Sequence, residues 1–169
     1  TIHFVRTDVP PGLKEPADIV KARGLIAGGL SADTSKDLRL RLGLDMLGVP
    51  HRYVTGYRSS PPARLALQRG EIHMFSESPP SYRSVVVPQL ITPGIAIPVF
   101  YDEVADPPPP SKQLEGLTIP SFPQLYKTIK GGTPSGQLWA AYRTLFEMNN
   151  ALLRLVALPP GAPRAAYDA

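Results

Sequence analysis

Residues 24–48 read GLIAGGLSADTSKDLRLRLGLDMLG, and this stretch decides the fold. Its first six residues form a small apolar run that ends in glycines, which is typical of a buried strand. The remainder predicts a helix, because leucines recur on one helical face as far as Leu47 and Gly48 then stops it. Thr34 precedes Asp37 by three residues, the spacing of an N-terminal capping box, although Glu or Gln is the better partner at the second position. The stretch is therefore one unit of strand, loop and helix.

The same order of elements recurs further along the chain. Strands are expected at residues 52–55, 71–75 and 95–101, and helices or turns at residues 61–69 and 81–90. Prolines suit the first turn of the helix at residue 61, since the N–H that they lack has no intrahelical partner there. Three such units in about 70 residues indicate right-handed βαβ crossovers, and so an α/β fold with a mainly parallel sheet flanked by helices.

The segments on either side carry weaker signals. Residues 1–5 predict a short strand and residues 15–23 a short helix, whereas residues 106–110, DPPPP, are typical of a stiff surface connector. After this connector, residues 117–122 are expected to form a short strand and residues 134–155 the longest helix. No sequence repeat of fixed period links these segments to the central region.

Composition narrows the class of protein. Of 169 residues, 43% are hydrophobic and 19% charged, with 21 prolines and 14 glycines, so we expect a compact, loop-rich domain or lobe. The chain has no cysteine, which excludes disulfides, thiolate metal sites and cysteine nucleophiles. The net charge of +4 comes from singly spread basic residues, so no nucleic-acid partner is expected. The longest apolar stretch, residues 90–100, contains two prolines and falls short of the roughly 20 residues of a membrane helix, so the chain is not expected to span a membrane.

Small hydroxyl residues gather in the three loops that follow strands and precede helices. These are Ser31, Thr34 and Ser35, then Ser59 and Ser60, then Ser76, Ser78 and Ser81. The carboxyl ends of parallel strands lie at one edge of a sheet, where ligands bind. Helix N-termini at that edge offer unpaired N–H groups and the positive end of the helix dipole, and can hold a carboxylate or phosphate. The sequence therefore predicts an anion-binding crevice, with ordinary helix capping as the alternative for any one of these residues.

Motifs for catalysis, metal binding or cofactor binding are incomplete. Residues 29–33 lie where a hydrolase nucleophile elbow would lie, but Asp33 replaces the second glycine of G-x-S-x-G. The three histidines are too scattered for a metal-ligand set, and residues 131–136, GGTPSG, lack the G-K-[ST] ending of a phosphate loop. The neighbouring carboxylates Asp102 and Glu103 precede the proline run and are expected to be solvated. No enzyme activity, catalytic residue, metal or cofactor is therefore expected.

Several short motifs, in order along the chain, resemble those of one protein family. Residues 44–57, LDMLGVPHRYVTGY, and residues 63–72, ARLALQRGEI, resemble the substrate-binding proteins of tripartite tricarboxylate transporters, the Bug-type family. In that family a Leu-Gly helix end leads to a strand, a GY loop and an ALxRGE segment. Residues 28–31 occupy the position of the family's glycine-serine loop, and residues 134–139 and 158–163 resemble its late helix and PPGxP segment. The match covers most of the chain.

This resemblance implies a periplasmic-binding-protein-like lobe with a three-layer α/β/α arrangement. It belongs, by the same resemblance, to a two-lobed periplasmic protein that clamps a small organic carboxylate and hands it to membrane permease subunits. Family members are much longer, which implies that residues 1–23 are a crossover segment from a first lobe and residues 24–105 the ligand-binding lobe. Residues 106–169 would then be a proline-rich connector and C-terminal helical segment, in which residues 164–169 resemble the family's LRxAFD helix after a short join.

The loop positions and the resemblance together assign ligand binding to Ser31, Thr34, Ser35, Tyr57, Ser76, Glu77 and Ser78. The first three are expected to form the main anion-holding group, with Tyr57 and Ser76 in support. Glu77 is the charged residue of the third loop. Facing the crevice, it would repel a plain dicarboxylate and favour an acid that carries an amine or hydroxyl; pointing outward, it would be solvated or cap a helix. A ligand-sensing module that reports to a signalling partner is the alternative to transport.

Overall fold

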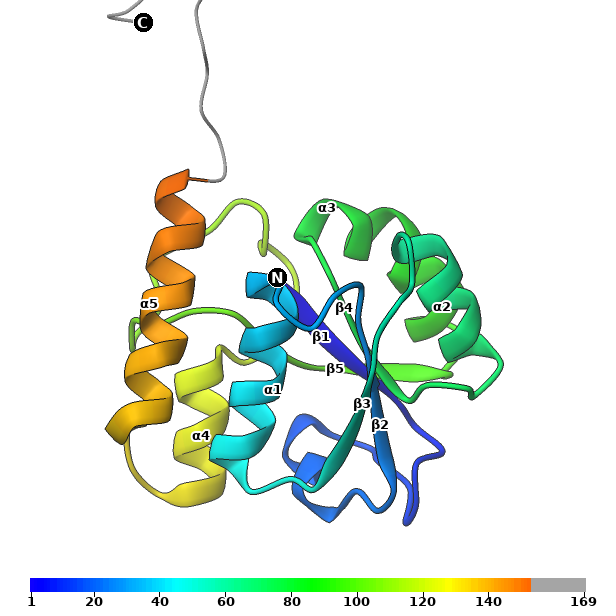
Figure 1. Ribbon diagram of the computed structural model, residues 1–169, viewed down its shortest axis with the longest axis horizontal. Coiled ribbons are helices and arrows are strands. Elements are labelled where there is room, and N and C mark those ends of the chain that lie inside the picture. The colour runs from blue at the N-terminus through cyan, green and yellow to red at the C-terminus, as the bar shows by residue number, and fades with distance from the viewer. Residues whose placement is uncertain (153–169) are drawn as a thin grey trace, which may run out of the picture.

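A five-stranded sheet forms the centre of the computed structural model, which describes residues 1–152 (Figure 1). The strands are β1 (Ile2–Arg6), β2 (Leu25–Gly28), β3 (His51–Val54), β4 (Met74–Glu77) and β5 (Ala96–Tyr101), in the spatial order β3-β2-β4-β1-β5. The β2 strand pairs in parallel with β3 and β4, whereas β1 pairs antiparallel with both β4 and β5. Four strands therefore run in one direction and β1 opposes them, so the expected mainly parallel sheet is confirmed with one antiparallel member.

Helices cover both faces of this sheet. One face carries the 3₁₀ helix η1 (Pro16–Lys21), α1 (Ser35–Leu47), α4 (Phe122–Lys130) and α5 (Gly136–Leu152). The other carries α2 (Ser60–Gln68), the single turn α3 (Pro79–Ser81) and the π-helix η2 (Tyr82–Ile91). The three-layer α/β/α arrangement is thus present, and no helix of the described residues is both long and apolar enough to cross a membrane.

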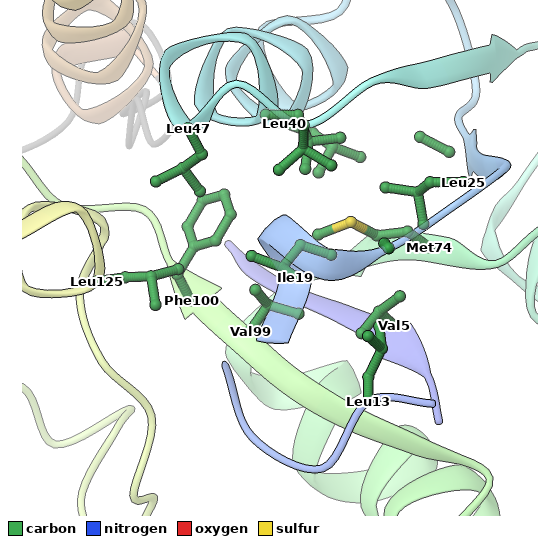
Figure 2. Packing of buried hydrophobic residues seen from close by; sticks show 14 of the residues in the cluster. Val5, Leu13, Ile19, Leu25, Leu40, Leu47, Met74, Val99, Phe100 and Leu125 are labelled. Atoms are coloured by element: carbon green, nitrogen blue, oxygen red, sulfur yellow. The ribbon is translucent and has the colours of Figure 1, made fainter. Parts of the chain in front are cut away.

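Two hydrophobic clusters hold the layers together, one on each face of the sheet. Figure 2 shows the first, in which Leu40 and Leu47 of α1 meet Ile19 of η1 and the β5 residue Phe100. The second cluster includes Phe4 and lies under α2 and η2. The two sets come from the same strands because successive side chains of a strand point to opposite faces.

Most predicted elements form where the sequence places them, with three differences. The third strand was expected at residues 71–75 but β4 spans Met74–Glu77, so Ser76 and Glu77 lie in a strand and not in a loop. The reason is pairing with a distant strand: Ile2 lies opposite Glu77 and His3 opposite Ser76. The sequence of residues 71–77 alone cannot show that β1 is the strand that pairs with it.

The other two differences lie after β5. Residues 117–122 form no strand; Ser121 makes a single bridge to Tyr101 and then caps α4, a helix that was not expected. The cap is a full capping box, in which the Ser121 hydroxyl accepts from the Gln124 N–H and the Gln124 side chain accepts from the Ser121 N–H. The end of the predicted helix at residues 134–155 and the motifs at residues 158–163 and 164–169 lie outside the described residues.

The pairing pattern brings several chain segments to one edge of the sheet, called here the carboxyl edge. The carboxyl ends of β2, β3, β4 and β5 meet there, and so does the N-terminal end of the antiparallel β1. Figure 1 shows α3, the start of the chain and the C-terminal end of α5 at this end of the molecule. The loops after residues 28, 54 and 77 therefore open onto the same edge, as the sequence predicts.

Candidate functional site

A hollow of about 490 Å³ opens at the carboxyl edge, and a second of about 270 Å³ adjoins it. The first lies between the start of α1, the turn α3, residue 113 and the end of α5; its side chains include Lys36, Arg39, Ser78, Gln113, Asn149 and Asn150. The second shares Thr1, Pro79, Gln113 and Asn150 with the first and adds Tyr101, Asp102 and Glu103. We call the two hollows together the edge cleft. Six segments far apart in the sequence thus build one polar depression: Thr1, the start of α1, residues 78–80, residues 101–103, residues 109–114 and the end of α5.

A carboxylate of the chain itself binds the loop that leads into α1. The Thr34 hydroxyl caps the helix by accepting from the Asp37 N–H at 3.4 Å, as the capping spacing predicts. The Asp37 side chain does not complete the box; its Oδ2 accepts from the N–H groups of Leu30 and Ser31 at 2.8 and 3.1 Å. The loop donors that the sequence offered to an external anion are therefore largely satisfied internally.

Gly29 makes this arrangement possible. A Cβ at this position would lie 2.1 Å from the Tyr53 hydroxyl and 2.7 Å from the Asp37 Oδ2. Neither could move away freely, because the Tyr53 hydroxyl donates to the Ser31 carbonyl at 3.1 Å and Asp37 is fully buried. The glycine is thus required for close approach of side chains and not for an unusual backbone angle.

Lys36 is a cation on the wall of the edge cleft, and the sequence reasoning missed it. Its Nζ donates to the Ser76 carbonyl at 3.2 Å, lies 3.6 Å from the Asp37 Oδ1 and 4.3 Å from the centre of the Phe75 ring. Burial lowers the pKa of Lys36, and Asp37 and Glu77 oppose that shift. The available signal was its position: a lysine in the first turn of a helix faces the positive end of the helix dipole, which disfavours a cation.

Behind this wall lies a group of hydrogen-bonded side chains, called here the buried polar cluster: His3, Arg39, Ser76, Asp102 and Tyr142, all at most 5% exposed. His3 Nδ1 lies 2.6 Å from the Ser76 hydroxyl, and His3 Nε2 lies 2.9 Å from the Asp102 Oδ1. The same Oδ1 accepts from the Tyr142 hydroxyl at 2.7 Å, and Oδ2 accepts from Arg39 Nε at 2.9 Å. The cluster joins β1, β4 and α1 to α5 and to Asp102, which directly follows β5.

Protonation follows from these contacts. Burial lowers the pKa of His3, against the pull of Asp102, so His3 is neutral and its Nε2–H donates to Asp102 while Nδ1 accepts from the Ser76 hydroxyl. Burial by itself would raise the pKa of Asp102, but the hydrogen bond from His3 and the charges of the Thr1 ammonium and Arg39 hold it well below its usual range, so Asp102 is ionised. Burial also raises the pKa of Tyr142.

Ser76, His3 and Asp102 are hydrogen-bonded in the order of a Ser-His-Asp catalytic triad, in which the serine is the nucleophile and the histidine the base. A nucleophile must touch its substrate, however, and both Ser76 and His3 are 0% exposed. The contacts of this cluster therefore support a structural role. Among residues 1–152, no group of three His, Cys, Asp or Glu side chains could hold a metal ion.

The structure distributes the seven residues expected to bind ligand over both sides of the sheet. Ser78 lines the edge cleft, and the hydroxyl of Ser35 belongs to the polar surroundings of Arg39, donating to the Leu145 carbonyl at 3.2 Å. The Ser76 hydroxyl is buried, but its carbonyl holds Lys36. Ser31 and Thr34 shape the loop before α1, through a bond from the Ser31 hydroxyl to Asp33 and through the cap.

Tyr57 and Glu77 lie on the other side. Tyr57 packs against the cluster under α2, and Glu77 is buried and ion-paired with Arg64 of α2. The pair neutralises Glu77, so this carboxylate is neither a free repulsive charge nor an exposed one. The sequence offered no sign of this pairing beyond the positions of the two charges.

Comparison with known proteins agrees with this fold. No family model matches the chain, and no curated protein sequence matches it. Among solved structures, the chain is similar to the crystal structure of a TctC solute binding protein from Polaromonas, determined without ligand, with a TM-score of 0.50 and 16% identity. The likeness covers 87% of this chain and 50% of the other, so the chain spans about half the length of that protein. It confirms, at the level of the fold, the resemblance to tripartite tricarboxylate solute-binding proteins that the motifs indicate.

Proposed function

We propose that this chain is the ligand-binding lobe of a solute-binding protein of the tripartite tricarboxylate type, and that it binds a small organic carboxylate for delivery to a membrane permease. The observation that carries the proposal is the polar edge cleft with Lys36 on its wall, at the sheet edge where ligands bind in open α/β folds. The fold shared with a TctC protein supports the same assignment.

The chemistry of the cleft suits a carboxylate, which accepts hydrogen bonds but donates none. Lys36 supplies a charged donor, and the N–H groups of Ser35 and Lys36, the first residues of α1, have no acceptor among residues 1–152. Ser78 and the amides of Gln113 and Asn150 add neutral donors. In this proposal Ser78 touches the ligand, and Thr34 and Ser31 fix the position of α1 behind it.

The proposal also assigns the protein to a compartment and to a non-catalytic role. A protein that captures solute for a permease works in the periplasm, and it releases its ligand unchanged, so no catalytic residue is assigned. Residues 24–105 supply most of the proposed lobe, and the end of α5 adds Asn149 and Asn150 to the cleft.

A thermal-shift and calorimetry panel tests the function directly. We expect at least one of acetate, succinate, citrate, benzoate and L-aspartate to raise the melting temperature of the 169-residue chain, because a ligand at 100 times its Kd stabilises the folded state by about 2.7 kcal/mol. Succinamide, which lacks the charges of succinate, should give no shift. Absence of a response to every acid at millimolar concentration would contradict the function.

A further inference from the structure

We propose that α5 carries the contact surface for a second copy of this chain, with the two α5 helices packed side by side in opposite directions. The surface is a stripe of apolar side chains along one flank of the helix, called here the α5 stripe: Leu138, Ala141, Leu145 and Met148. It is separate from the edge cleft, which takes Phe146, Asn149 and Asn150 from the same helix. The inference therefore goes beyond the proposed function and does not depend on it.

The α5 stripe is apolar and yet accessible. Leu138 is 44% exposed and Met148 is 54% exposed, and they are two of the four large apolar side chains that are exposed among residues 1–150. Figure 1 shows α5 at the outside of the molecule, with α1 and α4 on one side of it only. The helix is held there through a different face, which carries the buried Tyr142 and the half-buried Trp139. Two exposed apolar side chains on one flank mark a contact surface.

The spacing within the stripe fits a second helix. Its residues are three, four and three positions apart, which is the heptad spacing by which two helices interlock along a seam. The sequence keeps this spacing after Met148, with Leu152 and Leu155. A strand presents side chains with a period of two and would not match this seam, so the partner is expected to be a helix.

The charges of α5 favour a copy of the same helix over a charged partner. Its charged residues, Arg143 and Glu147, lie on the other side of the helix at 100° per residue and bond to each other at 3.3 Å. Gln137 and Thr144, which lie beside the stripe, are polar and uncharged. Two such flanks meet without repulsion, and nothing on them would attract an acidic or a basic partner.

Side-chain sizes favour the antiparallel arrangement. When the two helices are centred on residue 143, Ala141 faces the partner's Leu145 and Leu138 faces the partner's Met148. The small side chain then lies opposite a larger one, as close packing requires. A parallel pair would set Ala141 against its own copy and leave a gap. The antiparallel contact uses the same patch on both copies, which is the form that closes a two-fold dimer.

Residues 153–169 are the other candidate to cover the stripe. The last eight of them, APRAAYDA, hold one large apolar side chain, Tyr167, together with Arg164 and Asp168. Such a composition supplies little apolar surface for a stripe of four residues. It therefore favours a second copy of α5 over the chain's own C-terminal end.

Light scattering coupled to gel filtration tests the dimer on the 169-residue chain. We expect the mass to rise from 18.3 kDa at low micromolar concentration toward twice that value at a few hundred micromolar. Met148→Lys places a charge in the seam and should raise the dissociation constant about tenfold or more. Ala140→Lys, at an exposed position of α5 outside the stripe, should leave it unchanged. Both positions are exposed, so equal melting temperatures at low concentration should show that both variants fold.

The absence of cysteine allows the direction of the helices to be tested by crosslinking. Leu138→Cys and Met148→Cys, each the sole thiol of its chain, should form a disulfide-linked dimer when the two variants are mixed and oxidised. Each variant oxidised alone should form little, because the partner's matching position lies at the far end of the seam. Arg143→Cys, at the centre of the pair but on the other side of the helix, should also form little.

Four results would overturn the inference and leave the proposed function as it stands. These are a monomer at every concentration, unchanged dimerisation in Met148→Lys, an equal loss in Ala140→Lys, and efficient crosslinking of Leu138→Cys or Met148→Cys alone. A chain that dimerises only after removal of residues 153–169 would also overturn it, because the stripe would then belong to the chain's own C-terminal segment.

Discussion

The two faces of the sheet are built on different principles, although the same strands form them. On β1, His3 points into the buried polar cluster and the next residue, Phe4, points into the apolar cluster under α2. On β4, Phe75 likewise points into the apolar cluster and Ser76 into the buried polar cluster. The face toward α2 and η2 is held mainly by burial of apolar side chains, with one ion pair between Glu77 and Arg64. The face toward α1 and α5 is held near the carboxyl edge by directed hydrogen bonds around the ion pair of Arg39 and Asp102.

The difference bears on the edge cleft, because α1 and α5 of the polar face build much of its wall, opposite the turn α3. Arg39 and Ser35 both donate to the Leu145 carbonyl of α5, at 3.3 and 3.2 Å, and Tyr142 of the same helix donates to Asp102. The next turn of α5 carries Asn149 and Asn150 into the cleft. These bonds act together with the stacking of Trp139 and Tyr142 on Phe122 to fix the position of α5. The polar cluster thus sets the geometry of the cleft.

Removing the cation of the cluster should have the largest effect. Arg39→Met leaves the buried Asp102 without the Nε donor at 2.9 Å, and loss of one partner of a buried ion pair costs about 3–5 kcal/mol. We expect the free energy of unfolding, measured in urea, to fall by that amount. A fall in affinity for the bound acid should accompany it, because α5 loses its anchor.

The double variant Arg39→Met/Asp102→Asn separates pairing from packing. If the cost comes from an unpaired charge, removal of that charge should restore part of the stability, so the two substitutions will not add. A truncation on the apolar face, Leu90→Ala, supplies the comparison, since its cost of about 2–5 kcal/mol is a cavity term that no second substitution of charge can relieve. If the losses in free energy of unfolding of Arg39→Met and Asp102→Asn simply add in the double variant, the polar face is not held by charge pairing.

A smaller effect is expected from pH. Burial lowers the pKa of His3 from its ordinary 6.5, so below that pH the unfolded chain binds a proton that the folded protein refuses. The stabilisation is complete above pH 6.5 and is lost as the pH falls. Between pH 7.5 and 5.5 the loss attributable to His3 should reach up to about 1.4 kcal/mol.

Urea unfolding of His3→Gln at pH 7.5, 6.5 and 5.5 measures this contribution. The difference in stability between wild type and variant should shrink toward acid pH, because Gln cannot take up the proton. Leu90→Ala, on the apolar face and without a titratable side chain, should retain the pH dependence of the wild type. A constant difference between wild type and His3→Gln across the three pH values would show that His3 is not held neutral.

The local features of the fold could be predicted from the sequence, and its long-range pairings could not. In residues 24–48 the strand ends in a glycine pair, Thr34 caps α1 and Gly48 ends it. Each of these signals acts on residues close to it in the sequence, so the sequence alone predicts the result. The buried polar cluster depends on contacts between residues 73 and 99 positions apart, His3 to Ser76 and His3 to Asp102. Nothing near His3 distinguishes it from a surface histidine.

The candidate site divides in the same way. The sequence predicted which edge the loops share and that Thr34 caps α1, since both follow from strand direction and spacing. It placed Ser76 and Glu77 in a loop because the pairing of β4 with β1 lies outside the segment. It passed over Lys36 and Glu103 because a charge near a helix start or a proline run is usually solvated, and only the folded arrangement of α3, α5 and residue 113 makes a cleft around them.

The smallest expected effect compares two helix starts at the same edge, one on each face. Thr34 caps α1 with a side-chain bond to the Asp37 N–H, whereas Ser59 precedes α2 without one. Thr34→Ala should therefore lower the free energy of unfolding by about 0.5–1 kcal/mol, the lower part of the range for a lost cap because the bond is long at 3.4 Å. Ser59→Ala should change it by no more than a few tenths, since the serine contributes no capping bond. Both residues are hydroxyl residues in a strand-to-helix loop, so the sequence alone does not distinguish them. Equal losses of stability in urea unfolding would mean that the side-chain cap of α1 contributes nothing. A larger loss of stability for Thr34→Ala, together with weaker binding of the carboxylate at the edge cleft, would show that the cap also holds Lys36 in position. Lys36 is the second residue of α1, the helix that Thr34 caps.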